Sequence, residues 1–381
     1  MAGSIRVLVL LGVSLLLTSC ITVAHQHVTA LTYRLTPSCP DPPSRQVVTA
    51  DEVNKIVSRD DLPAWRAGDI GASARLSDGR LVWVFDDTLR TQRYNPQIVA
   101  NSILVSSGAC VSQLMTSENG PVIPDVEIGS VVRWPMSVAV LRHDPEVSAG
   151  TDVLVVLCAR TRRGQGGTLD FQFLGTSAAI FTVASGGVPT LRDVYQVTPD
   201  NADQHQVNWG AATTVVGPWF YVYGTRLPKG ALGHELYVAR APVADPRTRS
   251  RWQFWDGRHW QAHRSRAVPV MSDDPGVSQT LSVDEVHGQY VVTSKRGGDL
   301  GDFVYTWLSR TPAGPWRAHR ALRAPAGFDT GHYEYAPLAH PEIPVAPGHL
   351  LVSVSRNVKN LNQLLARPDK GRPLFAEVAG P

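Results

Sequence analysis

Three aspartates near the start of the chain are the residues whose type and spacing could support catalysis. Asp69 begins an apolar run, and the pair Asp86-Asp87 ends another. Asp87 follows Asp69 by 18 residues. Two carboxyl groups held close together can act as general acid and as base or nucleophile in glycoside hydrolysis. We therefore expect Asp69 and Asp87 to be catalytic and Asp86 to contact substrate. The alternative is that Asp86 or Asp87 caps a turn through Thr88.

A hairpin would bring these carboxylates together. The apolar runs at residues 70–76 and 81–85 flank Asp78-Gly79, and an Asp-Gly between two such runs strongly predicts a tight β-turn. Antiparallel pairing places the start of the first strand beside the end of the second. The sequence therefore predicts that Asp69 and the Asp86-Asp87 pair meet at one edge of a sheet.

The hairpin pattern recurs along the chain and predicts the fold class. Strong strands begin at residues 81, 153, 219, 290 and 350, and each follows a softer strand and a turn. Five antiparallel units of this size are typical of a five-bladed β-propeller around a central channel, in an all-β chain. A β-sandwich is the alternative, although it gives no reason for the superperiod. Residues 363–366 are expected to form the third strand of the last unit.

A propeller would line its channel with the first strand of each blade. We expect Glu334 to be a third catalytic carboxylate on such a strand. The remaining expected substrate contacts are polar or aromatic residues near strand starts or turns: Asn101, Asn208, Trp209, Gln279, His332 and Tyr335. Directed hydrogen bonds beside flat apolar faces suit a sugar. A zinc site of His332, Glu334 and His340 is an alternative, but no cysteine pair or helical zinc motif supports it, and Asn101 could equally serve a turn.

The N-terminal segment has the features of an export signal. Arg6 precedes an apolar run at residues 7–17, and Leu17-Thr-Ser-Cys20 resembles a bacterial lipobox. We expect a lipoprotein signal peptide at 1–20 with lipidation of Cys20, and a protein on the extracellular face of the cytoplasmic membrane. A cleaved signal without lipidation is the alternative. Residues 21–60 would form a tether with a possible ring-closing strand at 31–35, and 61–381 the propeller.

Composition and cysteine content limit the partners. The chain has 36 Lys and Arg against 33 Asp and Glu, a balance that argues against a nucleic-acid partner. Export would permit one disulfide among Cys39, Cys110 and Cys158, but the sequence does not choose the pair. No cofactor or metal motif stands out, so the expected partners are a glycan and, through the lipid, a membrane.

Several of these motifs resemble the bacterial family called domain of unknown function 4185. The resemblance covers about residues 64–357 and rests on Gly68-Asp-Ile-Gly-Ala-Ser73, on residues 78–88, 208–211, 221–225, 235–240 and 335–337, and on Ser353-Val-Ser-Arg-Asn357. It implies a five-bladed propeller and, for some members, endo-D-arabinofuranase activity on cell-wall arabinan. The active-site aspartates of the family would fall on Asp69 and Asp87. Asp86 departs from its usual glycine, and either adds charge to the pocket or points to the opposite face. A non-catalytic glycan-binding or scaffold propeller is the alternative function.

Overall fold

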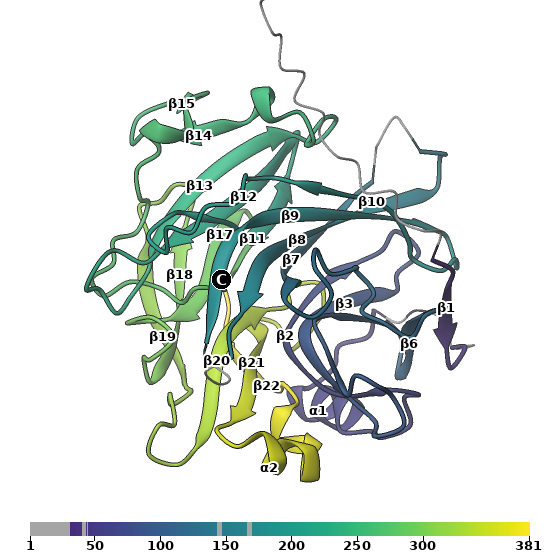
Figure 1. Cartoon of the computed structure of the whole chain (residues 1–381). Helices are drawn as coiled ribbons and strands as arrows, with labels where there is room; N and C mark the ends of the chain where they lie inside the picture. The colour runs from purple at the N-terminus through teal and green to yellow at the C-terminus, as the bar shows by residue number, and fades with distance from the viewer. Residues whose placement is uncertain (1–30, 40–42, 44, 143–146, 166–169) are drawn as a thin grey trace, which may run out of the picture.

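The computed structural model describes residues 31–39, 43, 45–142, 147–165 and 170–381, and these form a five-bladed antiparallel β-propeller. The expected all-β architecture is thereby confirmed (Figure 1). No helix within the described ranges is long and apolar enough to cross a membrane. The signal peptide at 1–20 and Cys20 lie outside the described residues.

Each blade orders its strands from the channel outward, nearly in chain order. In the first blade the order is β2 (Trp65–Arg75), β3 (Leu81–Arg90), β5 (Ser102–Ser107), β6 (Cys110–Thr116) and β1 (Tyr33–Thr36), with β4 (Ile98–Val99) paired to β3. The second blade contains β7 (Val131–Leu141), β8 (Thr151–Arg163), β9 (Phe171–Ala184) and β10 (Thr190–Gln196). The third contains β11 (Asn208–Val216), β12 (Trp219–Arg226), β13 (Glu235–Pro242), β14 (Gln253–Trp255) and β15 (Trp260–Gln261).

The last two blades follow the same plan. The fourth contains β16 (Ser282–Val286), β17 (Gln289–Lys295), β18 (Phe303–Ser309) and β19 (Arg317–Arg323), and the fifth β20 (His332–Ala339), β21 (His349–Val358) and β22 (Leu374–Ala379). The first strands of the five blades contact one another around the centre. Residues at the starts of these strands and at the ends of the second strands therefore share one mouth of the channel.

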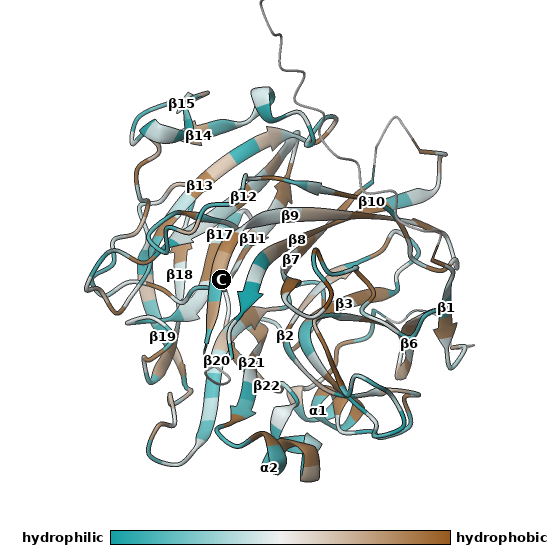
Figure 2. Cartoon of the chain, viewed as in Figure 1, coloured by the Kyte–Doolittle hydropathy of each residue, from teal (hydrophilic) through white to brown (hydrophobic). Residues whose placement is uncertain are grey.

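The core consists of apolar layers between neighbouring blades. One layer joins blades one and two through Val84, Ile103 and Phe181, and comparable layers lie at the other blade junctions. Figure 2 shows β8 apolar along most of its length and hydrophilic where it ends. That end carries Arg160, Arg162 and Arg163, so the polar residues of this strand collect at the mouth of the channel.

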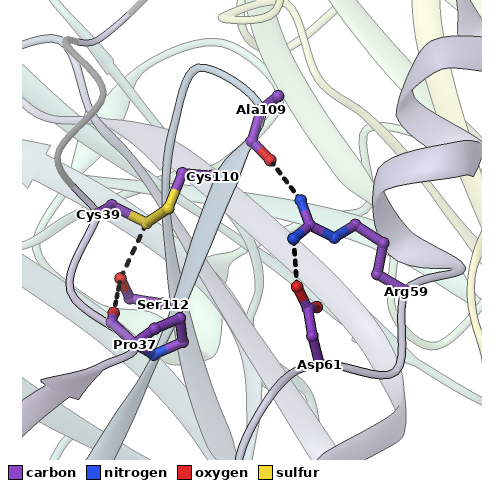
Figure 3. Close-up of a disulfide and its surroundings, with 7 residues drawn as sticks. All are labelled: Pro37, Cys39, Arg59, Asp61, Ala109, Cys110 and Ser112. Carbon is purple, nitrogen blue, oxygen red and sulfur yellow. Dashed lines mark hydrogen bonds and ion pairs between the residues drawn. A yellow bond between two sulfur atoms is a disulfide. The ribbon is translucent and has the colours of Figure 1, made fainter.

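The early strand predicted at 31–35 exists, but its position differs from the expectation. It is β1, and it pairs with β6 on the outer edge of the first blade instead of joining the last blade. A disulfide between Cys39 and Cys110 fixes this arrangement, as Figure 3 shows. Ser112 supports it by donating a hydrogen bond of 2.6 Å to the carbonyl of Pro37. Cys158 is buried and free.

A helix, which the sequence reading did not predict, bridges the first and last blades. Thr49 and Glu52 form a capping box at the start of α1 (Ala50–Val57), which lies beside β22 in Figure 1. The Asn54 side chain donates to the carbonyl of Phe375 and accepts from its N–H, both at 2.9 Å. Side-chain bonding from this helix therefore helps to close the ring, and within the described residues no strand is shared between the two blades.

The third strand of the last blade was also assigned wrongly. Residues 363–366 lie in α2 (Leu361–Ala366), and the third strand is β22. Asn360 accepts a hydrogen bond from the N–H of Asn362 and so caps the helix. Leu, Gln and Ala are good helix formers, and with a cap in place the local preference for helix prevails over strand.

Candidate active site

A β-bulge in the first hairpin brings the three aspartates to one place. Gly68 pairs with Thr88 and Ile70 pairs with Phe85, so both Asp86 and Asp87 stand opposite the single residue Asp69. Two residues facing one is the arrangement of a bulge, which disrupts strict alternation and redirects side chains. Asp86 therefore lies with the other two carboxyl groups: the charges of Asp69 and Asp87 act on Asp86, and the charge of Asp87 also acts on Asp69.

The backbone beside Asp69 is strained. Ile70 has a φ of 70°, a left-handed conformation that is rare for a β-branched residue. Its N–H donates a hydrogen bond of 2.8 Å to the Ser355 hydroxyl in the last blade. Strain of this kind costs about 1–3 kcal/mol and persists where the surrounding structure imposes it, often at functional sites. The first and last blades together therefore fix the position of Asp69.

Asp69 is the carboxyl group best suited to donate a proton near neutral pH. Burial raises the pKa of Asp69 to about 7, and the charge of Asp87 contributes to that rise. The Tyr335 hydroxyl donates a hydrogen bond to the carboxyl and opposes the shift. Asn357 lies between them, with its Nδ2 3.5 Å from Asp69 Oδ2 and 3.4 Å from the Tyr335 hydroxyl.

Asp87 is the carboxyl group with the strongest cationic support. Arg163 forms an ion pair with its Oδ1, and Trp134 Nε1 donates to the same oxygen at 2.9 Å. Burial raises the pKa of Asp87, whereas Arg163 and Trp134 lower it. The side chain keeps 34% of its surface exposed. Asp87 is therefore the member of the trio that is most readily ionised and reached by water.

Asp86 occupies the least favourable position for a charge. Burial raises its pKa well above the ordinary value, and the charges of Asp69 and Asp87 raise it further. Its Oδ1 is buried and has no hydrogen-bond partner within the described part of the chain. Burial and a neighbouring negative charge both favour the protonated form of a carboxyl group. The surroundings of Asp86 therefore favour its protonated form, which could donate a hydrogen bond beside Asp69 and Asp87.

Glu334, the expected third catalytic carboxylate, faces a different set of groups. The charges that act on it come from Arg356, Lys295 and Arg323, while burial raises its pKa. Its neighbour Tyr335 is the residue that reaches Asp69, because successive residues of a strand point to opposite faces. The structure therefore brings Asp86, and not Glu334, together with Asp69 and Asp87.

Two of the predicted substrate contacts are structural instead. Trp209 is only 1% exposed and packs against Tyr237 and Phe254 in the core between blades two and three. Asn101 uses its side chain on backbone groups: its Nδ2 donates to the carbonyls of Ile123 and Arg133, and its Oδ1 accepts from the Ile123 N–H. Neither side chain is available to a sugar.

The other predicted contacts lie elsewhere around the mouth. Asn208 is buried, and neither of its amide atoms has a partner among the described residues. Gln279 is half-buried, and its backbone bonds to Thr225 and Asp299. His332 is exposed. Within the described part of the chain, none of the three forms a hydrogen bond or ion pair with the three aspartates, whereas Tyr335 bonds to Asp69.

The zinc alternative is not supported by the placement of its residues. His340 is fully buried and bonds to Ser73 at 2.5 Å and to Ser353 at 2.8 Å, away from exposed His332. Among the residues that the structure describes, no three His, Cys, Asp or Glu side chains are grouped so as to hold a metal ion.

The sequence did not identify four residues that interact with Asp69 or Asp87 in the structure: Trp134, Arg163, Asn357 and Asp125. Asp125 lies in the connection between the first two blades, and its charge acts on Asp87. Trp134 lies near the start of β7, the first strand of the second blade. For Arg163 the available signal was its place at the end of a second strand, where the hairpin model also puts Asp87.

Comparisons with known proteins agree with this architecture. The model of the family described as Domain of unknown function (DUF5005) matches residues 51–380, and the chain belongs to that family. The resemblance to the domain of unknown function 4185 family is not confirmed by this match. No curated protein matches the chain.

Solved structures with a similar fold come from bacteria and fungi. A "putative hydrolase" from Bacteroides ovatus ATCC 8483 is 16% identical with a TM-score of 0.63, over 91% of this chain and 93% of that one. The α-L-arabinofuranosidase PaAbf62A from Podospora anserina is 10% identical with a TM-score of 0.45, over 84% of this chain and 92% of that one. At these identities the likeness to the first protein shows a shared fold, and chemistry has to be argued from the site.

Proposed function

We propose that the protein is a glycoside hydrolase that cleaves arabinofuranose-containing polysaccharide of the cell envelope, in the manner of an endo-arabinanase. The observation that carries the proposal is the contrast between two neighbouring carboxyl groups. The pKa of Asp69 is about 7, raised chiefly by burial, while Asp87 is paired with Arg163. Carboxyl groups whose environments separate their protonation states are the usual basis for acid and base roles in one site.

The proposed reaction assigns a step to each group. Protonated Asp69 gives its proton to the glycosidic oxygen as the bond to the anomeric carbon breaks. Ionised Asp87 then either takes a proton from the attacking water or attacks the anomeric carbon itself, according to whether the enzyme inverts or retains. In the second case water releases the sugar from Asp87 in a further step. Tyr335 and Asn357 hold Asp69 in position, and Arg163 with Trp134 holds Asp87.

The substrate class and the reaction class are supported by separate observations. The resemblance of residues 68–73 and 78–88 to arabinan-cleaving propellers suggests an arabinofuranose polymer. The solved structure with the same fold from Bacteroides ovatus is described as a "putative hydrolase", which agrees with the reaction class. The chemistry itself rests on the aspartate trio.

The direct test is incubation of the purified protein with a panel of arabinans and arabinogalactans, followed by chromatography of released oligosaccharides. We expect oligosaccharides from at least one arabinofuranose polymer and none from a matched glucan. Binding of the same polymers without release of any product would contradict hydrolysis and favour a glycan-binding propeller.

We also propose that Cys20 carries a lipid that holds the protein on the outer face of the cytoplasmic membrane. The motif Leu17-Thr-Ser-Cys20 supports this location. Cys20→Ser should release the protein from the membrane fraction or leave its signal peptide uncleaved. A processed Cys20→Ser protein that stays in the membrane fraction would refute the lipid anchor.

A further inference from the structure

An exposed aromatic pair lies beside Asp87 at the mouth of the channel. Trp134 lies near the start of β7 and Phe171 begins β9, and their ring centroids are 5.1 Å apart in an edge-to-face arrangement. Phe171 keeps 38% of its surface exposed. Part of the Phe171 ring is therefore open to solvent at the point where the second blade meets the catalytic carboxylates, and Trp134 beside it is half-buried.

The aromatic pair is joined directly to the catalytic group. Trp134 donates its indole N–H to Asp87 Oδ1 at 2.9 Å. Arg163 pairs with the same oxygen, and its guanidinium carbon lies 5.8 Å from the centre of the Trp134 ring. Because Arg163 and Phe171 are also cross-strand partners, the phenyl ring, the indole and the guanidinium form one continuous surface.

Packing requirements explain Trp134 but not Phe171. Trp134 packs against the small buried cluster of Met136, Ala159 and Phe173. Phe171 belongs to no buried apolar cluster of the described residues. Its exposed ring contributes little hydrophobic stabilisation, and a polar residue at this position would fold as well. Exposed apolar surface rimmed by polar groups is characteristic of binding sites.

We infer that Phe171 and Trp134 form a sugar-binding subsite, which receives the ring next to the one whose bond is cleaved. The C–H face of a sugar would stack on Phe171, and its hydroxyl groups would reach the N–H groups of Arg163. The inference rests on the proposed function, because it adds a subsite beside the same carboxyl groups. With this subsite the enzyme would bind a sugar unit of the polymer next to the unit whose bond is cleaved.

Binding to a catalytically silenced protein separates this subsite from hydrolysis. The probe is arabinohexaose, titrated by calorimetry into Asp69→Asn protein that carries Phe171→Ala, Phe171→Tyr or no second change. Covering one aromatic face contributes an affinity factor of about ten. We expect Phe171→Ala to weaken binding about tenfold and Phe171→Tyr, which keeps a flat ring, to leave it unchanged.

Phe328→Ala is the matched control. Phe328 is 55% exposed and forms its own aromatic pair with Tyr333, in a part of the chain that precedes the last blade. We expect this variant to bind arabinohexaose as tightly as the Asp69→Asn background. Thermal unfolding of each variant would show that the fold is retained.

The outcomes separate the subsite from the proposed function. Undiminished binding by Phe171→Ala, an equal loss in Phe328→Ala, or no binding of arabinohexaose to the background protein would overturn the subsite. Absence of cleavage by the wild-type protein, together with a selective loss of binding in Phe171→Ala, would refute hydrolysis and leave the subsite in place.

Discussion

Replacing Asp69 by asparagine should stabilise the folded protein above neutral pH. The reason is that the pKa of Asp69, raised chiefly by burial to about 7, is well above its unfolded value of 3.8. As pH rises from about 4 to about 7, the unfolded chain gives up a proton that the folded protein keeps. The stability that this group contributes is thus present at low pH and lost as pH passes 7.

The size of the effect follows from the shift. A difference of about three pKa units corresponds to about 4 kcal/mol at about 1.36 kcal/mol per unit. Asp69 still touches solvent and titrates together with its neighbours, so a discount for screening gives about 2 kcal/mol. We therefore expect Asp69→Asn to gain about 2 kcal/mol over the wild type between about pH 4 and pH 8, with no further gain above pH 8.

Urea unfolding of both proteins across this pH range measures the gap. Asp78→Asn, in the turn of the same hairpin, is the control. Burial acts to raise the pKa of Asp78, but hydrogen bonds from Arg80 and Gly186 outweigh it and leave the pKa lowered. This control should be less stable than the wild type by a constant amount from about pH 5 to pH 8, because its pKa lies below that range. A pH-independent gap for Asp69→Asn would refute the reasoning.

Three further predictions concern the partners of the site and the closure of the ring. Arg163→Leu removes the cation that lowers the pKa of Asp87, so the acidic limb of the kcat/KM profile should move up by about one pH unit; an unmoved limb would count against the base assignment. Asn54→Ala leaves two backbone groups of Phe375 without their partner and should cost about 1–3 kcal/mol in urea unfolding, whereas an unchanged midpoint would deny α1 its closing role. Replacing Cys39 and Cys110 by serine opens a loop that spans 71 residues and should cost about 2–4 kcal/mol in thermal unfolding without reductant; equal unfolding curves for the variant and the wild type would show that the disulfide does not stabilise the fold.

The fold could be predicted from sequence because its signal is local and repeated. Each blade is built from adjacent strands, so turns and alternating apolar residues carry most of the information. The exceptions were local too. The capping box at Thr49 and Glu52 indicates the start of α1, and Asn360 indicates the start of α2. Both helices were missed because they are short and lie among strands.

The position of Asp69 opposite Asp86 and Asp87 was also predictable, since antiparallel pairing requires it. The bulge that places Asp86 beside Asp69 was not predictable, because Ile70 is a residue type that normally avoids a positive φ. Alternation alone therefore left two orientations open for Asp86. The choice is made by a hydrogen bond from Ile70 to Ser355, in a blade nearly 300 residues away in sequence.

Residues that meet across blades were the hardest to predict. Arg163 reaches Asp87 only because the ends of β8 and β3 converge at the channel mouth. Arg160 is fully buried and paired with Asp200, although arginine side chains are mostly exposed. Trp209 is a residue type that often stacks on sugars, yet it packs in the apolar core between blades two and three. Such outcomes depend on the packing of blades, which a linear pattern does not contain.

The central claim is that Asp69 and Asp87 are the acid and the base or nucleophile of one reaction. The most direct measurement compares the rates at which the wild type, Asp69→Asn and Asp87→Asn release oligosaccharides from an arabinofuranose polymer that the wild type cleaves. Removal of general acid or base assistance typically costs about 10²–10⁴-fold, and both nearly isosteric variants should lose at least that much while remaining folded. Cleavage by both variants at close to the wild-type rate would contradict the account.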